Sequence, residues 1–309
     1  MRPTSLSVTE GLDLSGTTVL ITGATSGIGR ECARVLALRG ARVLIACRNV
    51  EKAERMLTEW RAAYGPAMSD RCEPRACDTA SMISVQGLVD GLRKDGLAID
   101  RLFLNAGVFA MPRQITSEGF EYTLAANYLG HFLMLHCLAT AGILAGAARI
   151  VVTLSESAHK NPFSRADVAM IAKNPPVSSA QMFSSPNSKV LLALMMGEFL
   201  RRAAHSKLSA IKFNAVDPGP TLTDNVNQGS RVQQMLGRTF GPMLLKKVDE
   251  GAAPLLWAAT SEAAAAMSGR LFTAVGKEAR LPAKCVDADV GAIVWTTSEL
   301  ALGLLPLAN

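Results

Sequence analysis

The sequence has no run of about 18 or more uncharged apolar residues, which is the minimum for a bilayer-spanning helix, although apolar residues make up 49% of its 309 positions. Residues 1–16 also lack the apolar core of a signal peptide. These two absences argue against a membrane-spanning helix and against secretion, so we expect a cytoplasmic protein. The apolar content is enough for one large core, which makes a single domain the default expectation.

Metal-binding and disulfide motifs are absent as well. The six cysteines are scattered, with no CxxC pair and no Cys/His cluster at zinc spacing. We therefore expect neither a metal nor a disulfide framework, and we interpret the cysteines as reduced, buried thiols.

Aromatic residues are few, at 5%, and no basic run alternates with them. The net charge of +6 comes from Lys and Arg spread along the chain, so it does not indicate a nucleic-acid partner. Solvated helix faces and an anionic ligand explain the charge better. His131 and His136 are five residues apart, which does not align them on one helical face, and we interpret both as structural.

What the chain does contain is a regular alternation of short β-branched runs with longer stretches of helical period. Such alternation is typical of βαβ units around a parallel sheet. The expected strands cover residues 17–22, 41–46, 72–76, 101–104, 149–154, 212–216 and 269–273. The expected helices cover residues 28–38, 51–64, 80–94, 120–139, 187–204, 251–260 and 288–303. The predicted fold is α/β, a doubly wound, mostly parallel sheet of about seven strands of the Rossmann type.

Three segments fall outside this alternation. Residues 1–15 form an N-terminal extension, and residues 156–185 form a loop-rich insertion. Residues 221–247 are polar and contain glycine, and we expect them to cover a hydrophobic pocket for a small-molecule substrate. No linker that would separate two domains is present in the sequence. Assembly into a homo-oligomer is compatible with it.

The clearest motif lies between the first strand and the first helix. Its predicted cofactor-binding residues are Gly23, Thr25, Ser26, Gly27, Ile28 and Gly29. Glycines at this spacing let the backbone approach a pyrophosphate, and the helix N-terminus presents free N–H groups to it. A dinucleotide site is the interpretation we prefer over an ordinary tight turn.

The end of the second strand indicates which dinucleotide is bound. An NAD site would place Asp or Glu there against the ribose 2′-hydroxyl, whereas this chain has Arg48 and Asn49. Arg48 can pair with a 2′-phosphate, and Arg30 adds positive potential at the first helix. The sequence therefore predicts NADP(H), against the alternative that Arg48 is a solvated surface arginine.

The order of further motifs resembles the short-chain dehydrogenase/reductase family, specifically its retinol-dehydrogenase-like branch. The matches span nearly the whole chain. They are residues 22–29 (TGATSGIG), Cys77-Asp78, Asn105-Ala106-Gly107, residues 127–132 (NYLGHF), residues 149–152 leading to Ser155, Pro218-Gly219 with Thr221 and Thr223, Trp257, and residues 298–300 (SEL).

The resemblance implies roles for these residues. Asn127 would kink its helix and hold a water, Ser155 would hydrogen-bond the substrate oxygen, and Lys189 would grip the nicotinamide ribose. The cofactor contacts it implies are Asp78 with the adenine, and Asn105, Ala106, Gly107, Pro218, Gly219, Thr221 and Thr223 elsewhere in the cofactor site.

The chain departs from the family at one position. The family's catalytic helix begins Tyr-x-x-x-Lys, and here Ser185 stands four residues before Lys189. An aliphatic hydroxyl is a far weaker acid than a phenol of pKa ~10. Ser185 followed by Pro186 also fits an ordinary helix start, with Ser as N-cap and Pro at the first helical position.

Other groups could supply the proton, namely Glu156, His159 and Asp167 in the insertion. A Ser-Lys hydrolase built on Ser185 and Lys189 is a weaker option, because no oxyanion-hole sequence accompanies the pair.

Three hypotheses of function follow. The first is an NADPH-dependent reductase, or dehydrogenase in reverse, acting on a lipophilic carbonyl or alcohol. The second is a non-redox cyclase or isomerase of specialised metabolism that reuses the pocket. The third is a catalytically inactive cofactor-binding protein, which gives no reason for retaining Asn127, Ser155 and Lys189 together.

Overall fold

The computed structural model describes residues 2–109, 114–155, 185–222 and 245–307. Its sheet has eight strands in the order β3-β2-β1-β4-β5-β6-β7-β8, all parallel except the β7–β8 pair. The strands are β1 Thr18–Thr22, β2 Arg42–Cys47, β3 Cys72–Ala76, β4 Ile99–Leu104, β5 Leu144–Thr153, β6 Lys212–Val216, β7 Leu271–Ala274 and β8 Lys277–Ala279. The predicted fold class, a doubly wound and mostly parallel sheet in a single domain, is confirmed.

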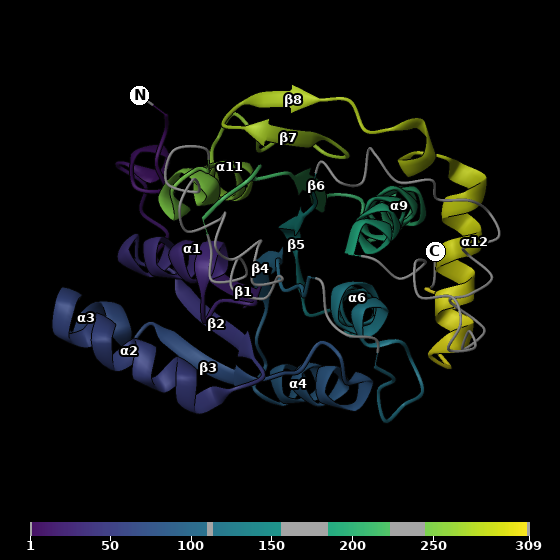
Figure 1. Cartoon of the computed structure of the whole chain (residues 1–309), viewed down its shortest axis with the longest axis horizontal. Helices are drawn as coiled ribbons and strands as arrows, with labels where there is room; N and C mark the ends of the chain where they lie inside the picture. Colours follow the sequence, from purple (N-terminus) through teal and green to yellow (C-terminus); the bar gives the residue numbers. More distant parts are fainter. Residues whose placement is uncertain (1, 110–113, 156–184, 223–244, 308–309) are drawn as a thin grey trace, which may run out of the picture.

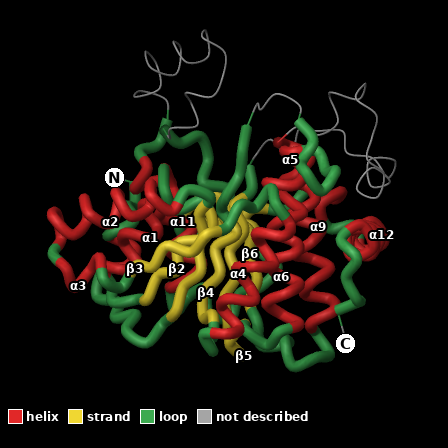
Figure 2. Tube along the Cα trace, turned by 90° about the horizontal axis from the view of Figure 1, so that it is seen from below, coloured by secondary structure: helices red, strands yellow, loops and turns green. Residues whose placement is uncertain are grey.

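Helices cover both faces of the sheet (Figures 1 and 2). One face carries α1, α2 and α11, and the other carries α4, α6 and α9, with α12 as a further layer outside α9. Their bounds are α1 Gly27–Leu38, α2 Val50–Tyr64, α4 Met82–Lys94, α6 Gly130–Thr140, α9 Ser185–Ala203, α11 Val248–Thr260 and α12 Ala288–Ala301. Two hydrophobic cores result, one on each face, as both faces of a parallel sheet require.

The helix predicted over residues 120–139 is the main correction to the helices. It is divided into α5 (Tyr122–Leu124), a π-helical turn η2 (Ala125–Leu129) and α6. The side chain of Asn127, inside the π turn, bonds to the backbone of Val108 rather than to its own helix. Apolar periodicity cannot reveal such a turn, because it records only which face is buried.

The strands differ from the prediction at two places. β5 begins at Leu144, five residues before the predicted start at 149, because Leu144 pairs with Ile99 of β4, ahead of a register shift, in a stretch that no β-branched residue marks. β8 was not predicted, since its sequence KEA has no strand signal. A tight turn at Gly276, with φ of 65°, brings β8 back beside β7. A short helix α3 (Pro66–Ser69) was also missed.

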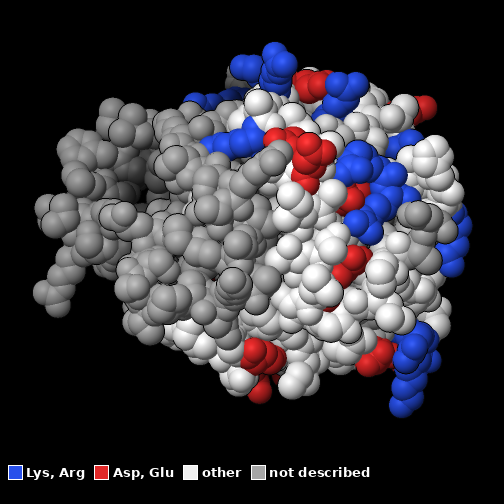
Figure 3. Space-filling view, turned by 90° about the vertical axis from the view of Figure 1, so that its right-hand side faces the viewer, with Lys and Arg blue, Asp and Glu red and all other residues white. Residues whose placement is uncertain are grey.

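Buried polar groups attach α12 to the helices beneath it. The hydroxyls of Tyr128 and Ser298 lie 2.9 Å apart and join the π turn to α12. Glu299, 3% exposed, accepts hydrogen bonds from Trp295 Nε1 at 2.6 Å and from Leu307 N at 2.9 Å. Figure 3 shows the side of the molecule that carries α12, where Lys and Arg groups are interspersed with Asp and Glu.

None of the helices in the described part of the chain combines the length and the apolarity that crossing a bilayer requires.

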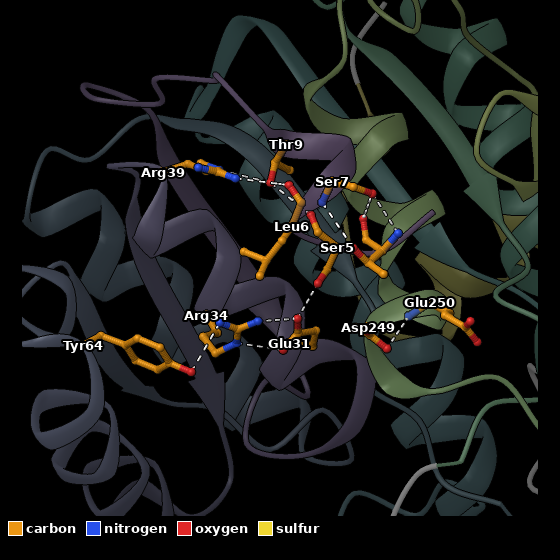
Figure 4. Close-up of polar contacts among 11 residues, drawn as sticks. Ser5, Leu6, Ser7, Thr9, Glu31, Arg34, Arg39, Tyr64, Asp249 and Glu250 are labelled. Carbon is orange, nitrogen blue, oxygen red and sulfur yellow. Dashed lines mark hydrogen bonds and ion pairs between the residues drawn. The ribbon is translucent and has the colours of Figure 1, made fainter. Parts of the chain in front are cut away.

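The N-terminal segment connects α1 with α11, and Figure 4 shows its polar contacts. Ser5 N donates to Asp249 O at 3.0 Å, and Ser5 Oγ donates to Glu31 on α1. Arg39, directly after α1, also contacts this segment by donating to Leu6 O at 3.1 Å. Ser5 is fully buried, so its two bonds are shielded from water, whereas the bond from Arg39 to Leu6 O lies at the surface.

We expect Ser5→Ala to lower the free energy of unfolding by about 1–3 kcal/mol, because it removes a buried hydrogen bond to a carboxylate. Urea denaturation would measure the change. Ser7→Ala is the matched control: its hydroxyl bonds to the backbone of the nearby Thr4 at the surface, so the change should stay within about 0.5 kcal/mol. Equal effects of the two substitutions would contradict the inferred role of Ser5.

Candidate functional site

A cavity of about 460 Å³ lies at the carboxyl ends of β1, β2, β3, β4 and β5. The sheet order reverses between β1 and β4, and ligands of doubly wound folds bind at such a switch point. The predicted site residues that line this cavity are Gly23, Thr25, Ser26, Gly27, Ile28, Gly29, Arg48, Asn49, Asp78, Asn105, Ala106, Gly107, Asn127 and Lys189.

The glycine-rich turn has the close packing that its sequence predicts. Gly23 has a φ of 69°, and a Cβ there would stand 2.8 Å from Ala106 Cα. A Cβ on Gly29 would collide with Gly23 O. Both positions therefore require glycine, and the N-terminus of α1 opens directly onto the cavity. An anionic diphosphate fits this cradle of backbone N–H groups.

Thr22, at the end of β1, joins this turn to the loop that follows β4. Its Oγ1 accepts hydrogen bonds from Asn105 N at 2.9 Å and from Ala106 N at 3.0 Å. The Asn105 side chain bonds back to Thr22 O at 3.1 Å, and Thr153 Oγ1 donates to Asn105 Oδ1 at 3.1 Å. The ends of three strands, β1, β4 and β5, are thus tied into one rigid wall.

His131 continues this network, and burial keeps its ring neutral. Its Nδ1 lies 3.1 Å from Asn127 O, which can only accept, so Nδ1 carries the proton. Its Nε2 lies 3.0 Å from Thr22 Oγ1, whose two lone pairs are already used by Asn105 N and Ala106 N. The Thr22 hydroxyl has two acceptors for its proton, His131 Nε2 and Phe103 O at 3.2 Å. Burial, together with the charge of Lys189, lowers the pKa of His131 to about 3.

Asn127 and Lys189 meet on the far side of the cavity. Asn127 Oδ1 accepts from Val108 N at 2.7 Å, and its Nδ2 donates to Val108 O at 3.0 Å and to Ser188 Oγ at 3.1 Å. Lys189 Nζ donates to Thr153 O at 2.7 Å. Asn127 lies inside the π turn η2, and its implied roles of kinking the helix and holding a water stay predictions.

Lys189 is a titratable group of the cavity wall whose pKa is lowered by its surroundings. The side chain is buried at 8% exposure, yet it lines the cavity. Burial lowers the pKa of Lys189 to about 8, against the opposing effect of Asp217. A lysine with this pKa can bind or release a proton near neutral pH.

Basic and polar groups line the end of the cavity beside β2 and α2. Asn49 caps α2 by accepting from Lys52 N at 2.6 Å, and Arg48 and Lys52 both line the wall. Burial raises the pKa of the two thiols there, Cys47 to about 11 and Cys77 to about 12, so both are uncharged at neutral pH. This end of the cavity is electropositive apart from Asp78.

Several predicted residues do not line the cavity. Ser155 directly follows the lining residue Leu154, and Pro218, Gly219 and Thr221 follow β6. Thr221 pairs with Lys246, which closes the base of the segment predicted to cover the substrate pocket. Arg30 forms an ion pair with Glu59 at 2.6 Å instead of lining the cavity.

Some expectations fall on residues outside the described part of the chain. These are Thr223, Glu156, His159 and Asp167, and most of segments 156–185 and 221–247. Helix α9 begins at Ser185, two residues before its predicted start, but the side chains of Ser185 and Pro186 also lie outside it. Whether Ser185 caps the helix therefore stays a prediction.

Sequence reasoning missed several lining residues, among them the polar residues Lys52, Tyr122 and Thr153. Lys52 stands four residues after Arg48, a spacing that could have signalled a second cation. Tyr122 comes from a separate turn and had no signal. Tyr128 is fully buried, does not line the cavity and bonds to Ser298, so it does not replace the missing phenol.

Comparison with known proteins gives one family match and clear relatives. A family model described as short chain dehydrogenase matches residues 17–167. Retinol dehydrogenase 14 of Homo sapiens is 31% identical over 307 residues, covering 94% of this chain and 88% of that protein. The WW domain-containing oxidoreductase of Drosophila melanogaster is 34% identical over 273 residues, covering 87% of this chain. The chain spans only 64% of the length of that relative.

A solved structure agrees in fold. A short chain dehydrogenase from Burkholderia cenocepacia, in complex with NADP, has a TM-score of 0.63 at 24% identity, over 85% of this chain and 98% of that one.

We expect the neutral His131 to make stability depend on pH. Its pKa falls from 6.5 to about 3 on folding, so unfolding should become easier as the pH falls from about 6.5 to about 3. Each pKa unit corresponds to about 1.4 kcal/mol. Urea denaturation at several pH values should show a shallower loss for His131→Gln than for the wild type. His205→Gln, at an exposed position, is the control and should keep the wild-type slope. Parallel slopes for all three proteins would contradict the prediction.

Proposed function

Because this chain belongs to the short-chain dehydrogenase family, in its retinol-dehydrogenase-like branch, we propose that it is an oxidoreductase that uses NADP(H) on a carbonyl or alcohol of a lipophilic small molecule. The observation that carries the proposal is the cavity at the switch point, with a glycine cradle at its centre and two cations at one end. The names of its retinol dehydrogenase relatives support a lipophilic substrate.

The preference for NADP(H) rests on charge. Arg48 and Lys52 line the cavity beside the N-terminus of α2, where the helix dipole also favours an anion. A 2′-phosphate would be held there by charge-assisted hydrogen bonds from the guanidinium and the ammonium. The described lining residues at this end carry no Asp or Glu to bind a ribose 2′-hydroxyl, apart from Asp78, whose carboxylate accepts from Ala80 N at 3.0 Å.

The chain's own residues divide the chemical work. The cofactor, when bound, supplies or accepts the hydride. Lys189 would hold the ribose through its ammonium, whose position is set by its bond to Thr153 O. Asn127 keeps the π turn and the loop at Val108 in register, and Ser155 would donate a hydrogen bond to the substrate oxygen.

Proton transfer needs a substitute for the family's tyrosine. A serine hydroxyl at position 185 is too weak an acid to donate near neutral pH. Lys189, with its pKa lowered to about 8, is the described cavity residue best suited to hold or release that proton, directly or through water. The residues 156, 159 and 167 named from the sequence remain alternatives.

A second candidate function follows from the same substitution. A non-redox cyclase or isomerase would need a carbonyl positioned by Ser155 and Asn127 but no phenol, so Ser185 favours it. Under that proposal the substrate is converted without net consumption of NADPH.

The cofactor proposal is tested by calorimetry with NADPH and NADH. We expect the wild type to bind NADPH more tightly, and Arg48→Ala to weaken NADPH by roughly 10- to 150-fold, corresponding to about 1.5–3 kcal/mol for a charge-assisted contact. Arg30→Ala removes the same charge from an arginine already paired with Glu59, and should leave both affinities nearly unchanged. Equal affinities of the wild type for the two cofactors would refute the NADP preference.

The redox proposal is tested by supplying the missing phenol. We expect Ser185→Tyr to raise NADPH-dependent reduction of a generic ketone, by up to the roughly 10²–10⁴-fold typical of general acid catalysis. NADPH absorbance measures the rate. Because Pro186 constrains the helix start, Ser185→Tyr combined with Pro186→Ala is measured in parallel. If neither variant consumes NADPH faster, while the wild type converts its substrate without cofactor turnover, the non-redox candidate replaces the reductase.

A further inference from the structure

Arg48 and Tyr122 meet across the mouth of the cavity. Arg48 directly follows β2, whereas Tyr122 is the first residue of α5, 74 positions later. Arg48 Nη1 donates to the Tyr122 hydroxyl oxygen at 2.8 Å, and both side chains line the cavity wall together with Lys52. This hydrogen bond joins two walls that share no strand.

The Tyr122 ring is held firmly at its end of the bond. Tyr122 N donates to Gln114 O at 2.9 Å, and the preceding Glu121, 3% exposed, caps α5 by accepting from Leu124 N at 2.7 Å. The ring itself packs against the core on the α6 side of the sheet. The hydroxyl therefore occupies a defined position, whereas Arg48 is an exposed side chain that this bond orients.

The bond leaves both partners able to bind an anion. A guanidinium has five N–H donors in one plane, and Tyr122 uses only one of them. The phenol accepts from Arg48, so its own proton points elsewhere and is available to a further acceptor. Fixing Arg48 before a ligand arrives also removes part of the ordering free energy that binding would otherwise cost.

We propose that Tyr122 is a specificity-determining residue, whose hydroxyl holds the Arg48 guanidinium so that this pair, together with Lys52, selects a dinucleotide with a 2′-phosphate. The proposal rests on the proposed use of NADP(H) and adds the residue that orients its recognition. A 2′-hydroxyl in place of the phosphate gains nothing from this arrangement, because it offers no charge for the guanidinium to pair with.

The test is Tyr122→Phe, which removes a single oxygen, with binding of NADPH and NADH measured by calorimetry. We expect the Kd for NADPH to rise by about 5- to 30-fold and the Kd for NADH to change by less than about 2-fold. In a protein that already carries Arg48→Ala, Tyr122→Phe should have almost no further effect on NADPH, because the two residues act as one unit.

The matched control is Tyr64→Phe. Tyr64 also accepts from an arginine, Arg34 Nη1 at 3.4 Å, but this pair lies on α2 and α1 away from the cavity (Figure 4). Its substitution should leave both affinities unchanged. Thermal unfolding of each variant checks that the fold is intact.

Three results would overturn the proposal for Tyr122. An equal loss of NADPH and NADH affinity would make the ring a general contact, and tighter NADPH binding would mean that the hydroxyl competes with the phosphate for Arg48. Independent losses in the double variant would separate the two residues. Failure of the NADP(H) proposal itself is distinguishable, because the unmodified protein would then bind the two cofactors equally.

Discussion

The hydroxyl group of Thr22 is the point on which the site depends. It accepts from two successive backbone N–H groups after β4, and both acceptors within reach of its proton, His131 Nε2 and Phe103 O, lie inside the protein. Burial keeps His131 neutral, and Nδ1 of the neutral ring donates to the carbonyl of Asn127. The loop after β4 bonds directly to this hydroxyl at the start of the glycine cradle, and the π turn is joined to it through His131.

The cavity has two ends with different physical character. At the end beside α2, exposed cations and a helix N-terminus create a positive potential that can recognise charge. At the other end, Lys189 is buried among Thr153, Asn127 and Ser188, and burial makes its ammonium easier to deprotonate. Binding and chemistry are thus separated along one cavity, and the network around Thr22 lies between them.

Much of this arrangement could be predicted from the residues and their spacing. The strand order of a doubly wound sheet brings the carboxyl ends of successive strands to one edge, so motifs far apart in sequence had to meet there. The glycine cradle at Gly23 and Gly29 and the cation at Arg48 were predicted from motif and position, and Lys189 from the resemblance to the family's Tyr-x-x-x-Lys pattern. Lys52 was within reach of the same reasoning, because it stands four residues after Arg48, in the first turn of α2. Tyr122 was not, since its contact with Arg48 depends on how a turn after β4 folds over the cavity.

Sequence alone determined the fold class, most element positions and many of the side chains that line the cavity, because hydrophobic period and glycine requirements are local properties. Tertiary structure alone decided the division of one long apolar helix by a π turn, since the Asn127 side chain bonds to a loop distant in sequence. It also decided that Tyr128 faces α12, that His131 is neutral and that the pKa of Lys189 is low. Each of these depends on what surrounds a side chain in space, and residues from distant parts of the chain provide those surroundings.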